Sequence, residues 1–295
     1  MASEDAQRPT LELRKTYAGP IDELSMLDAS LLFAQLSQAS YLHPDYVRDY
    51  APQLGLELDQ FIDRDGAQAY VFESDTDRII ACRGTEPTDW NDVKADVNAL
   101  TVVAETVGRV HRGFKREVDD LWPKVEEELS TKDMRKLWFT GHSLGGAMAT
   151  ISAGRCYLAH IPQMPEHVYT FGAPRVGTKR YVQNVDLNIT RWVNNNDMVT
   201  RVPPAWLGYQ HVGQRKYINA YGKVRRLTRR QRAKDRWRGF VAGLKEGKID
   251  HFTDHSIAGY VAHIADAVEE HDAGQTRHQL EETEHPTPGS ETMTP

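Results

Sequence analysis

The segment Gly141-His142-Ser143-Leu144-Gly145-Gly146 constrains the fold of this chain more than any other feature. It lies between an apolar run over 136–140, typical of a buried strand, and a stretch over 147–158 that is rich in small residues and predicts a helix. The glycines on either side of Ser143 leave room for a sharp turn that holds a serine in a strained conformation. The segment therefore predicts a nucleophilic serine. A glycine-rich turn whose serine only caps the helix would have the same sequence pattern.

Strand-like and helix-like patterns alternate on both sides of this turn. Apolar residues recur at helical spacing over 21–41, and a further helix is predicted over about 114–128. Short β-rich runs occupy 67–73, 78–83, 167–171 and 189–193. This alternation predicts an α/β fold with a mostly parallel central sheet flanked by helices. We expect one such domain over residues 21–270, preceded by a polar extension over 1–20.

Charge is unevenly distributed along the chain. Residues 225–238 contain eight Lys or Arg and one acid, Asp235, whereas residues 265–295 contain eight acids and one Arg. Apolar residues at helical spacing accompany the basic block, so we expect a basic helical insertion at about 224–248. Its helix over 224–244 could pack on the core or contact an anionic membrane peripherally. The acidic tail over 271–295 is polar and is expected to be disordered.

Composition limits the partners and the location of the protein. The net charge is −6, and no base-reading module accompanies the basic block, so we expect no nucleic-acid partner. No stretch approaches the ~20 apolar residues that span a bilayer, so no transmembrane segment is expected. The first twenty residues lack the apolar run of a secretory signal. These features predict a cytoplasmic protein that could associate with a membrane surface.

A serine nucleophile needs a base, and the base needs a carboxylate to orient it. Asp197 follows a strand-like run over 190–193, which places it at the carboxyl edge of the sheet, where Ser143 also lies. His251 and His255 both lie in the loop before the last apolar helical pattern. Sequence spacing does not distinguish these two histidines as the base.

Several motifs occur together, in one order, between Ser74 and Val268. They are Arg83-Gly84-Thr85, Asp89-Trp90, Val110-His111-Arg112-Gly113-Phe114, the segment around Ser143, Tyr169-Thr170-Phe171-Gly172-Ala173-Pro174-Arg175-Val176-Gly177, Asn196-Asp197 with Val202-Pro203-Pro204, and Asp254-His255 with Tyr260. In this set and order the chain resembles the class 3 lipase family of fungal-type triacylglycerol lipases and their bacterial and plant relatives.

The resemblance implies an α/β-hydrolase that cleaves the carboxylic esters of acylglycerols or related lipids without a metal or organic cofactor. It implies a catalytic triad of Ser143, Asp197 and His255, and so selects His255 over His251. It also implies an oxyanion hole formed by the backbone N–H groups of Thr85 and Leu144. Two alternatives use the same residues differently, namely a phospholipase A-type enzyme that docks on anionic membranes and a catalytically silent lipid-binding scaffold.

The resemblance further implies a lid over the acyl pocket, within about 86–105 after the Arg83-Gly84-Thr85 strand. Trp90 is the candidate anchor of this lid. The segment is more charged than the fungal pattern, through Asp89, Asp92, Lys94, Asp96 and Glu105. This charge favours a soluble or micellar ester over emulsified fat.

Overall fold

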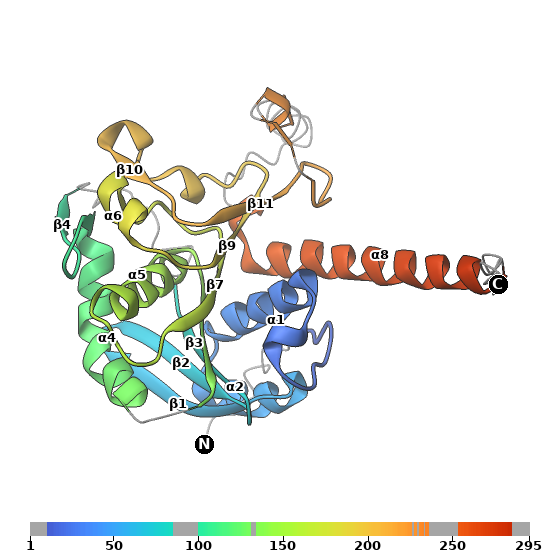
Figure 1. Cartoon of the computed structure of the whole chain (residues 1–295), viewed down its shortest axis with the longest axis horizontal. Helices are drawn as coiled ribbons and strands as arrows, with labels where there is room; N and C mark the ends of the chain where they lie inside the picture. Colours follow the sequence, from blue (N-terminus) through green and yellow to red (C-terminus); the bar gives the residue numbers. More distant parts are fainter. Residues whose placement is uncertain are drawn as a thin grey trace, which may run out of the picture.

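The computed structural model describes residues 11–84, 100–130, 134–225, 227–228, 230–232, 234–235 and 253–284. A seven-stranded sheet with the order β1-β2-β3-β6-β7-β9-β11 runs through its centre (Figure 1). Its strands are β1 (Glu57–Arg64), β2 (Ala67–Glu73), β3 (Asp77–Cys82), β6 (Lys136–His142), β7 (Pro165–Phe171), β9 (Ile189–Asn194) and β11 (Gln214–Ile218). β1, β2 and β3 pair antiparallel, and every pair from β3 to β11 is parallel. The predicted mostly parallel α/β sheet is confirmed.

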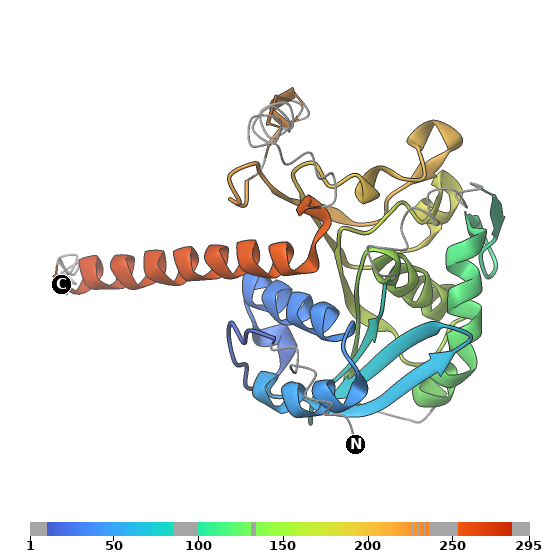
Figure 2. The same ribbon diagram turned by 180° about the vertical axis from the view of Figure 1, so that it is seen from behind.

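Helices cover both faces of this sheet (Figures 1 and 2). One face carries α4 (Arg112–Ser130) and α5 (Leu144–Leu158), and the other carries α1 (Met26–Ala39) and α8 (Ile257–Glu284). The sheet therefore separates two apolar clusters. The shorter helices are η1 (Ile21–Glu23), α2 (Pro44–Tyr50), η2 (Ala51–Leu54), α6 (Lys179–Asn184), η4 (Val199–Arg201), η5 (Ala205–Leu207) and η6 (Thr253–His255).

Helix α4 shows why these segments become helices that cover the sheet. Its buried apolar residues recur every three or four positions and so form one stripe that faces the sheet. They are Phe114, Val118, Leu121, Trp122, Val125 and Leu129. The opposite face of α4 is rich in Lys, Arg, Asp and Glu. Burial of this stripe fixes α4 against the sheet.

A second, four-stranded sheet was not predicted from the sequence. It has the order β10-β8-β5-β4 and consists of β4 (Thr101–Val103), β5 (Arg109–His111), β8 (Gly177–Thr178) and β10 (Tyr209–Gln210). Strands of two or three residues are too short to show the alternation that identifies a strand in a sequence. This sheet joins segments that follow different strands of the main sheet.

Part of the predicted N-terminal extension packs against the domain. Tyr17 is buried, and the backbone N–H of Arg14 donates to Gln35 Oε1 of α1 at 2.9 Å. Lys15 Nζ contacts Asp28 of α1 at 2.6 Å and Asp272 of α8 at 3.0 Å. Residues 11–20 therefore link the two helices on this face of the sheet.

The tail differs from its prediction, because α8 continues as a helix from residue 271 to Glu284. Val268 is the last residue of α8 described as buried, and the remaining turns extend away from the body of the protein (Figure 1). Glu, Gln, Leu, Ala and Arg dominate these turns and favour a helix, and no proline interrupts them. Lys223 also forms an ion pair with Glu270 at the base of this segment. Residues 285–295 lie outside the described part.

Most of the predicted basic insertion over 224–248 lies outside the described residues. Within it, Arg230–Arg232 and Lys234–Asp235 are helical. The single acid, Asp235, is buried and accepts hydrogen bonds from Tyr217 Oη at 3.0 Å and from the Ala220 N–H at 3.1 Å. Asp235 therefore attaches the basic block to β11. In the part of the chain that the structure describes, no helix is both long and apolar enough to cross a bilayer.

Candidate functional site

Ser143 occupies the sharp turn between β6 and α5. Its backbone has φ 59° and ψ −128°, a conformation that residues other than glycine rarely adopt. A Cβ at Gly141 would lie 2.4 Å from the backbone of Gly145, and one at Gly145 would lie 2.2 Å from the carbonyl oxygen of Cys82. Both positions therefore require glycine. The Ser143 side chain makes no capping hydrogen bond to α5, which excludes the interpretation as a simple helix cap.

The structure brings together the three residues that the sequence predicts to act together. Ser143 Oγ lies 2.9 Å from His255 Nε2, and His255 Nδ1 lies 3.0 Å from Asp197 Oδ2. A carboxylate only accepts, so Nδ1 carries the proton when the ring is neutral. Nε2 then has a free lone pair and accepts from the Ser143 hydroxyl. The arrangement can withdraw a proton from Ser143 and hold the resulting imidazolium beside a carboxylate.

Asp197 is positioned by contacts from two elements. It lies just after β9, fully buried, and its Oδ1 accepts from the Val199 N–H at 2.9 Å. Its Oδ2 accepts a second bond from Tyr260 Oη of α8 at 2.6 Å. Burial, together with the negative charge of Asp197, raises the pKa of Tyr260 well above its usual value, so its hydroxyl stays a donor. Sequence reasoning placed Tyr260 in the last helix and in a family motif, without a role at this carboxylate.

A second set of contacts joins the loop of Asp197 to the loop of His255. Asp254 Oδ2 accepts from the Asn196 N–H at 3.1 Å and from Asn195 Nδ2 at 3.3 Å. Asn194 Nδ2 donates to the Asp254 carbonyl oxygen at 3.1 Å. Burial, and next the nearby charge of Asp197, raise the pKa of Asp254. These bonds fix the backbone on either side of the Asp197–His255 contact. The alternative histidine, His251, lies outside the described residues.

His142 precedes Ser143 and contacts the backbone of His255. Its Nε2 lies 2.6 Å from the His255 carbonyl oxygen, and its Nδ1 lies 2.9 Å from Tyr41 Oη. Burial and the adjacent His255 hold the pKa of His142 well below its usual value, so the ring is neutral. A carbonyl only accepts, so Nε2–H donates to His255 and Nδ1 accepts from the Tyr41 hydroxyl. Sequence reasoning gave neither Tyr41 nor His142 a role in the site, since Tyr41 lies 101 positions before His142.

The predicted oxyanion hole is described in part. Leu144 is the first residue of α5, and N–H groups at a helix start have no partner within the helix. Thr85 lies outside the described residues. The residue before it, Gly84, is close to the turn, since a Cβ there would lie 2.6 Å from the His142 carbonyl oxygen and 2.3 Å from Tyr41 Oη.

Trp90 and most of the predicted lid also lie outside the described residues. The end of the predicted lid segment is described, and there Thr101–Val103 forms β4. Glu105 accepts from Arg155 Nε of α5 at 2.5 Å and lies 3.7 Å from Lys115 Nζ of α4. This end of the segment is therefore held by a strand and by ion pairs with both helices on that face.

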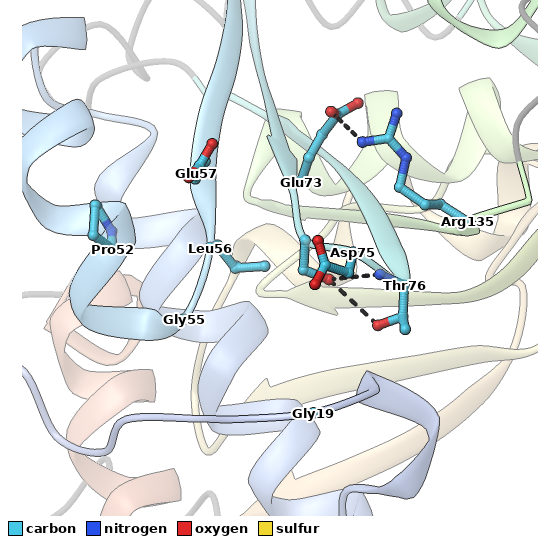
Figure 3. A pocket seen from close by; sticks show the side chains of 10 residues that line it. Gly19, Pro52, Gly55, Leu56, Glu57, Glu73, Asp75, Thr76 and Arg135 are labelled. Carbon is cyan, nitrogen blue, oxygen red and sulfur yellow. Dashed lines mark hydrogen bonds and ion pairs between the residues drawn. The ribbon is translucent and has the colours of Figure 1, made fainter.

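A pocket of about 590 Å³ lies at the opposite end of the sheet (Figure 3). It is lined by the turn after β2, the start of β1 and Arg135, which precedes β6, and Arg135 forms an ion pair with Glu73. Ligands of parallel sheets bind at the carboxyl ends of the strands, where Ser143 lies, and this pocket is at the amino end. Among the described residues, no three His, Cys, Asp or Glu side chains form a group that could hold a metal ion.

Comparison with known proteins finds similar sequences and similar folds among lipases. The family model described as Lipase (class 3) matches residues 79–206. Toxin TseL of Vibrio cholerae is 29% identical over 236 residues, which cover 66% of this chain and 34% of the toxin. Secreted mono- and diacylglycerol lipase MDL3 of Malassezia globosa is 29% identical over 217 residues, which cover 67% of this chain and 71% of that lipase. The triacylglyceride lipase structure from Rhizomucor miehei superposes with a TM-score of 0.56 at 23% identity, covering 65% of this chain and 80% of that one.

These comparisons correct the predicted location of the protein. The expected cytoplasmic location is wrong, because similar proteins from Malassezia are secreted lipases and point to an extracellular location. The chain spans only about a third of the length of the toxin, 34%. The likeness to the Rhizomucor structure shows that the fold is that of an α/β-hydrolase.

Proposed function

The chain belongs to the class 3 lipase family, and on that premise we propose that it is a serine hydrolase that cleaves the carboxylic esters of acylglycerols or related lipids. The observation that carries this proposal is the continuous hydrogen-bond chain from Ser143 Oγ through the His255 ring to Asp197. A lipid-binding scaffold has no need of a strained serine, an imidazole in contact with it and a buried carboxylate behind that ring.

Ser143 Oγ attacks the carbonyl carbon of the ester while His255 Nε2 takes the hydroxyl proton. The carbon–oxygen bond to the alcohol then breaks, His255 returns the proton to the leaving alkoxide, and the acyl group stays on Ser143. Water repeats the sequence, with His255 again as the base, and releases the fatty acid. Asp197 stabilises the imidazolium that forms in both steps. The same site would transfer the acyl group if an alcohol replaced the water.

The tetrahedral intermediate places a negative charge on the former carbonyl oxygen. The Leu144 N–H, at the positive end of α5, is a donor for this oxyanion. The family resemblance supplies Thr85 as the second donor. Loss of one such donor typically costs about 2.7–4 kcal/mol of transition-state stabilisation.

The direct test is covalent labelling with a serine-directed fluorophosphonate, followed by peptide mapping. We expect one adduct, on Ser143, and loss of both labelling and turnover of a short-chain diacylglycerol in Ser143→Ala. Ser152→Ala, a second buried serine on α5, is the matched control and should keep both. An adduct on a different residue, or turnover by Ser143→Ala equal to that of the wild type, would contradict the assignment.

A second proposal concerns membrane contact and the phospholipase A-type alternative. Arg225, Arg230 and Lys234 are exposed, and Asp235 anchors the segment that carries them to β11. Exposed cations close together attract an anionic membrane surface, each by about 1 kcal/mol at low salt. We therefore propose that this basic block brings the protein onto anionic lipid, with acyl phospholipids as a further substrate.

Vesicle sedimentation tests this second proposal. The protein should bind phosphatidylglycerol vesicles more than phosphatidylcholine vesicles, and high salt should release it. The triple variant Arg225→Gln, Arg230→Gln, Lys234→Gln should lose this preference. The double variant Lys179→Gln, Arg180→Gln, which removes exposed cations on α6, is the control. Equal binding by the wild type and the triple variant would overturn the proposal.

A further inference from the structure

Arg191, in the middle of β9, is a buried cation that has no counter-charge among the described residues. Arg191 is 8% exposed, and its Nε has no hydrogen-bond partner among the described residues. Within the described part of the chain, no carboxylate forms an ion pair with it. Buried guanidinium groups in proteins are normally paired, because an unpaired buried charge is costly. An anion is therefore the group that this position lacks.

Among the described residues, the charged groups that act most strongly on Arg191 are further cations. Arg215 of β11 is its register partner, so the two side chains leave the sheet on the same face. Arg175 is near enough for its charge to lower the pKa of Arg191, and the charge of Arg191 in turn lowers the pKa of His211. Burial, and next the charges of Arg215 and Arg175, together lower the pKa of Arg191 to about 9.

The cluster is rigid and partly open to solvent. Arg175 Nη1 donates to the carbonyl oxygens of Arg201 and Pro203, with 2.9 Å to the latter. His211 Nε2 lies 2.8 Å from the Thr200 carbonyl oxygen, so Nε2–H donates to it. Arg175 and His211 are half-buried, and Arg215 is exposed. The exposure of Arg215 therefore marks the side from which a small anion would approach the cluster.

The cluster also lies close to the reacting serine. Arg191 is in register with Thr170 of β7, which is in register with Gly141 of β6. Two strand spacings separate Arg191 from Gly141, which is roughly 10 Å. Ser143 follows Gly141 by two residues. One lipid molecule is long enough to place an ester at Ser143 and a charged group near Arg191.

We propose that Arg191, Arg175 and Arg215 form a binding site for a phosphate-type anion, carried either by the headgroup of a lipid substrate or by free phosphate. Guanidinium groups are planar multiple donors that match phosphate oxygens. Arg215 is in register with Arg191, and Arg175 is near enough for its charge to act on Arg191. The headgroup source rests on the proposed esterase function. The site itself does not, because anion binding can be measured without turnover.

The first experiment uses inorganic phosphate as the probe and thermal unfolding as the readout. Phosphate should raise the unfolding temperature of the wild type above that in sodium chloride of equal ionic strength, by about 3 °C near saturation. Arg191→Gln should abolish the difference, and Arg180→Gln on the exposed face of α6 should keep it. Arg215→Gln is a second variant at an exposed position, so a folding defect in Arg191→Gln leaves the test intact. No phosphate effect on the wild type, or equal effects in all variants, would overturn the proposal.

The second experiment separates the two sources of the anion. Short-chain phosphatidylglycerol and short-chain diacylglycerol are compared as monomers, below the concentration at which either forms micelles. If the headgroup is the ligand, Arg191→Gln and Arg215→Gln should lower kcat/KM for the phospholipid about 10-fold through KM, with little change for the diacylglycerol. A phosphate effect on unfolding without this selective loss identifies free phosphate as the ligand. Absence of all ester turnover in the wild type would refute the proposed function while the phosphate measurement still decides the site.

Discussion

Tyr260 and His255 share one oxygen atom of Asp197. The Tyr260 hydroxyl donates to Oδ2 at 2.6 Å, and the His255 Nδ1–H donates to the same atom at 3.0 Å. His255 is the last residue of η6, and Tyr260 lies in the first turn of α8. The first turn of α8 therefore fixes the direction in which the Asp197 carboxylate faces His255.

Tyr260→Phe removes this donor without changing the shape of the core. It also leaves the Asn194 N–H, which bonds Tyr260 Oη at 2.9 Å, without its acceptor. We expect kcat to fall about 10-fold and the free energy of unfolding to fall by about 1–3 kcal/mol. Steady-state kinetics and urea unfolding measure the two effects. Tyr221→Phe, at a residue that is 69% exposed, should change neither, and an unaltered kcat in Tyr260→Phe would show that Asp197 needs no second donor.

Gly172 provides the space in which Asp197 and His255 meet. It has φ 62°, and a Cβ there would lie 2.7 Å from Asp197 Oδ2 and 2.9 Å from His255 Nδ1. We expect Gly172→Ala to separate the two side chains and to lower kcat by at least about 100-fold. Gly66→Ala is the matched control, because Gly66 has φ 90° and nothing lies within 4 Å of its Cβ position. It should lose stability from backbone strain and keep its kcat, so equal losses of kcat in both variants would contradict the steric argument.

The contact from Tyr41 through His142 to the backbone of His255 predicts coupling between two variants. Tyr41→Phe removes the donor to Nδ1, and His142→Gln shortens the link to the His255 carbonyl. Each should lower kcat several-fold with little effect on KM, because both act on the position of His255. In a double-mutant cycle the two losses should be less than additive, by about 1 kcal/mol. Fully additive losses would mean that the two side chains act separately.

Buried neutral histidines predict a loss of stability in acid. Burial lowers the pKa of His167 to about 4, and burial with the charge of Arg112 lowers that of His111 to about 4. The unfolded chain takes up these protons near pH 6.5 and the native state only near pH 4, so stability falls as the pH decreases through this window. His142 and His211 shift in the same direction.

The measurement is the free energy of unfolding by urea between pH 7 and pH 4. His167→Gln should reduce the loss over this interval by roughly 2 kcal/mol relative to the wild type. His160→Gln, at an exposed residue, is the control. The same loss in His167→Gln as in the wild type would show that this histidine takes up its proton equally in both states.

Much of the architecture was predictable because its signals are local. The strand before Ser143, the glycine-rich turn and the following helix were predicted within a few residues of β6 and α5. Longer strands such as β2 and β9 were found by their apolar residues. Two strands of the sheet were missed because neither has a continuous apolar run. Most residues of β1 are polar and exposed or half-buried, and β11 has only two buried residues.

The sequence by itself determined the turn that strains Ser143, the order of nucleophile, acid and base, and the family. These depend on residues close together in the chain, or on motifs that can be compared directly. Only the tertiary structure decided which side chains hold that site in place. His142 and His255 are 113 positions apart, Tyr260 and Asp197 are 63 apart, and Arg191 meets Arg215 across two strands. Hydrogen bonds and charges act over a few ångströms in space, so partners this distant in sequence are paired by the packing of the sheet and its helices.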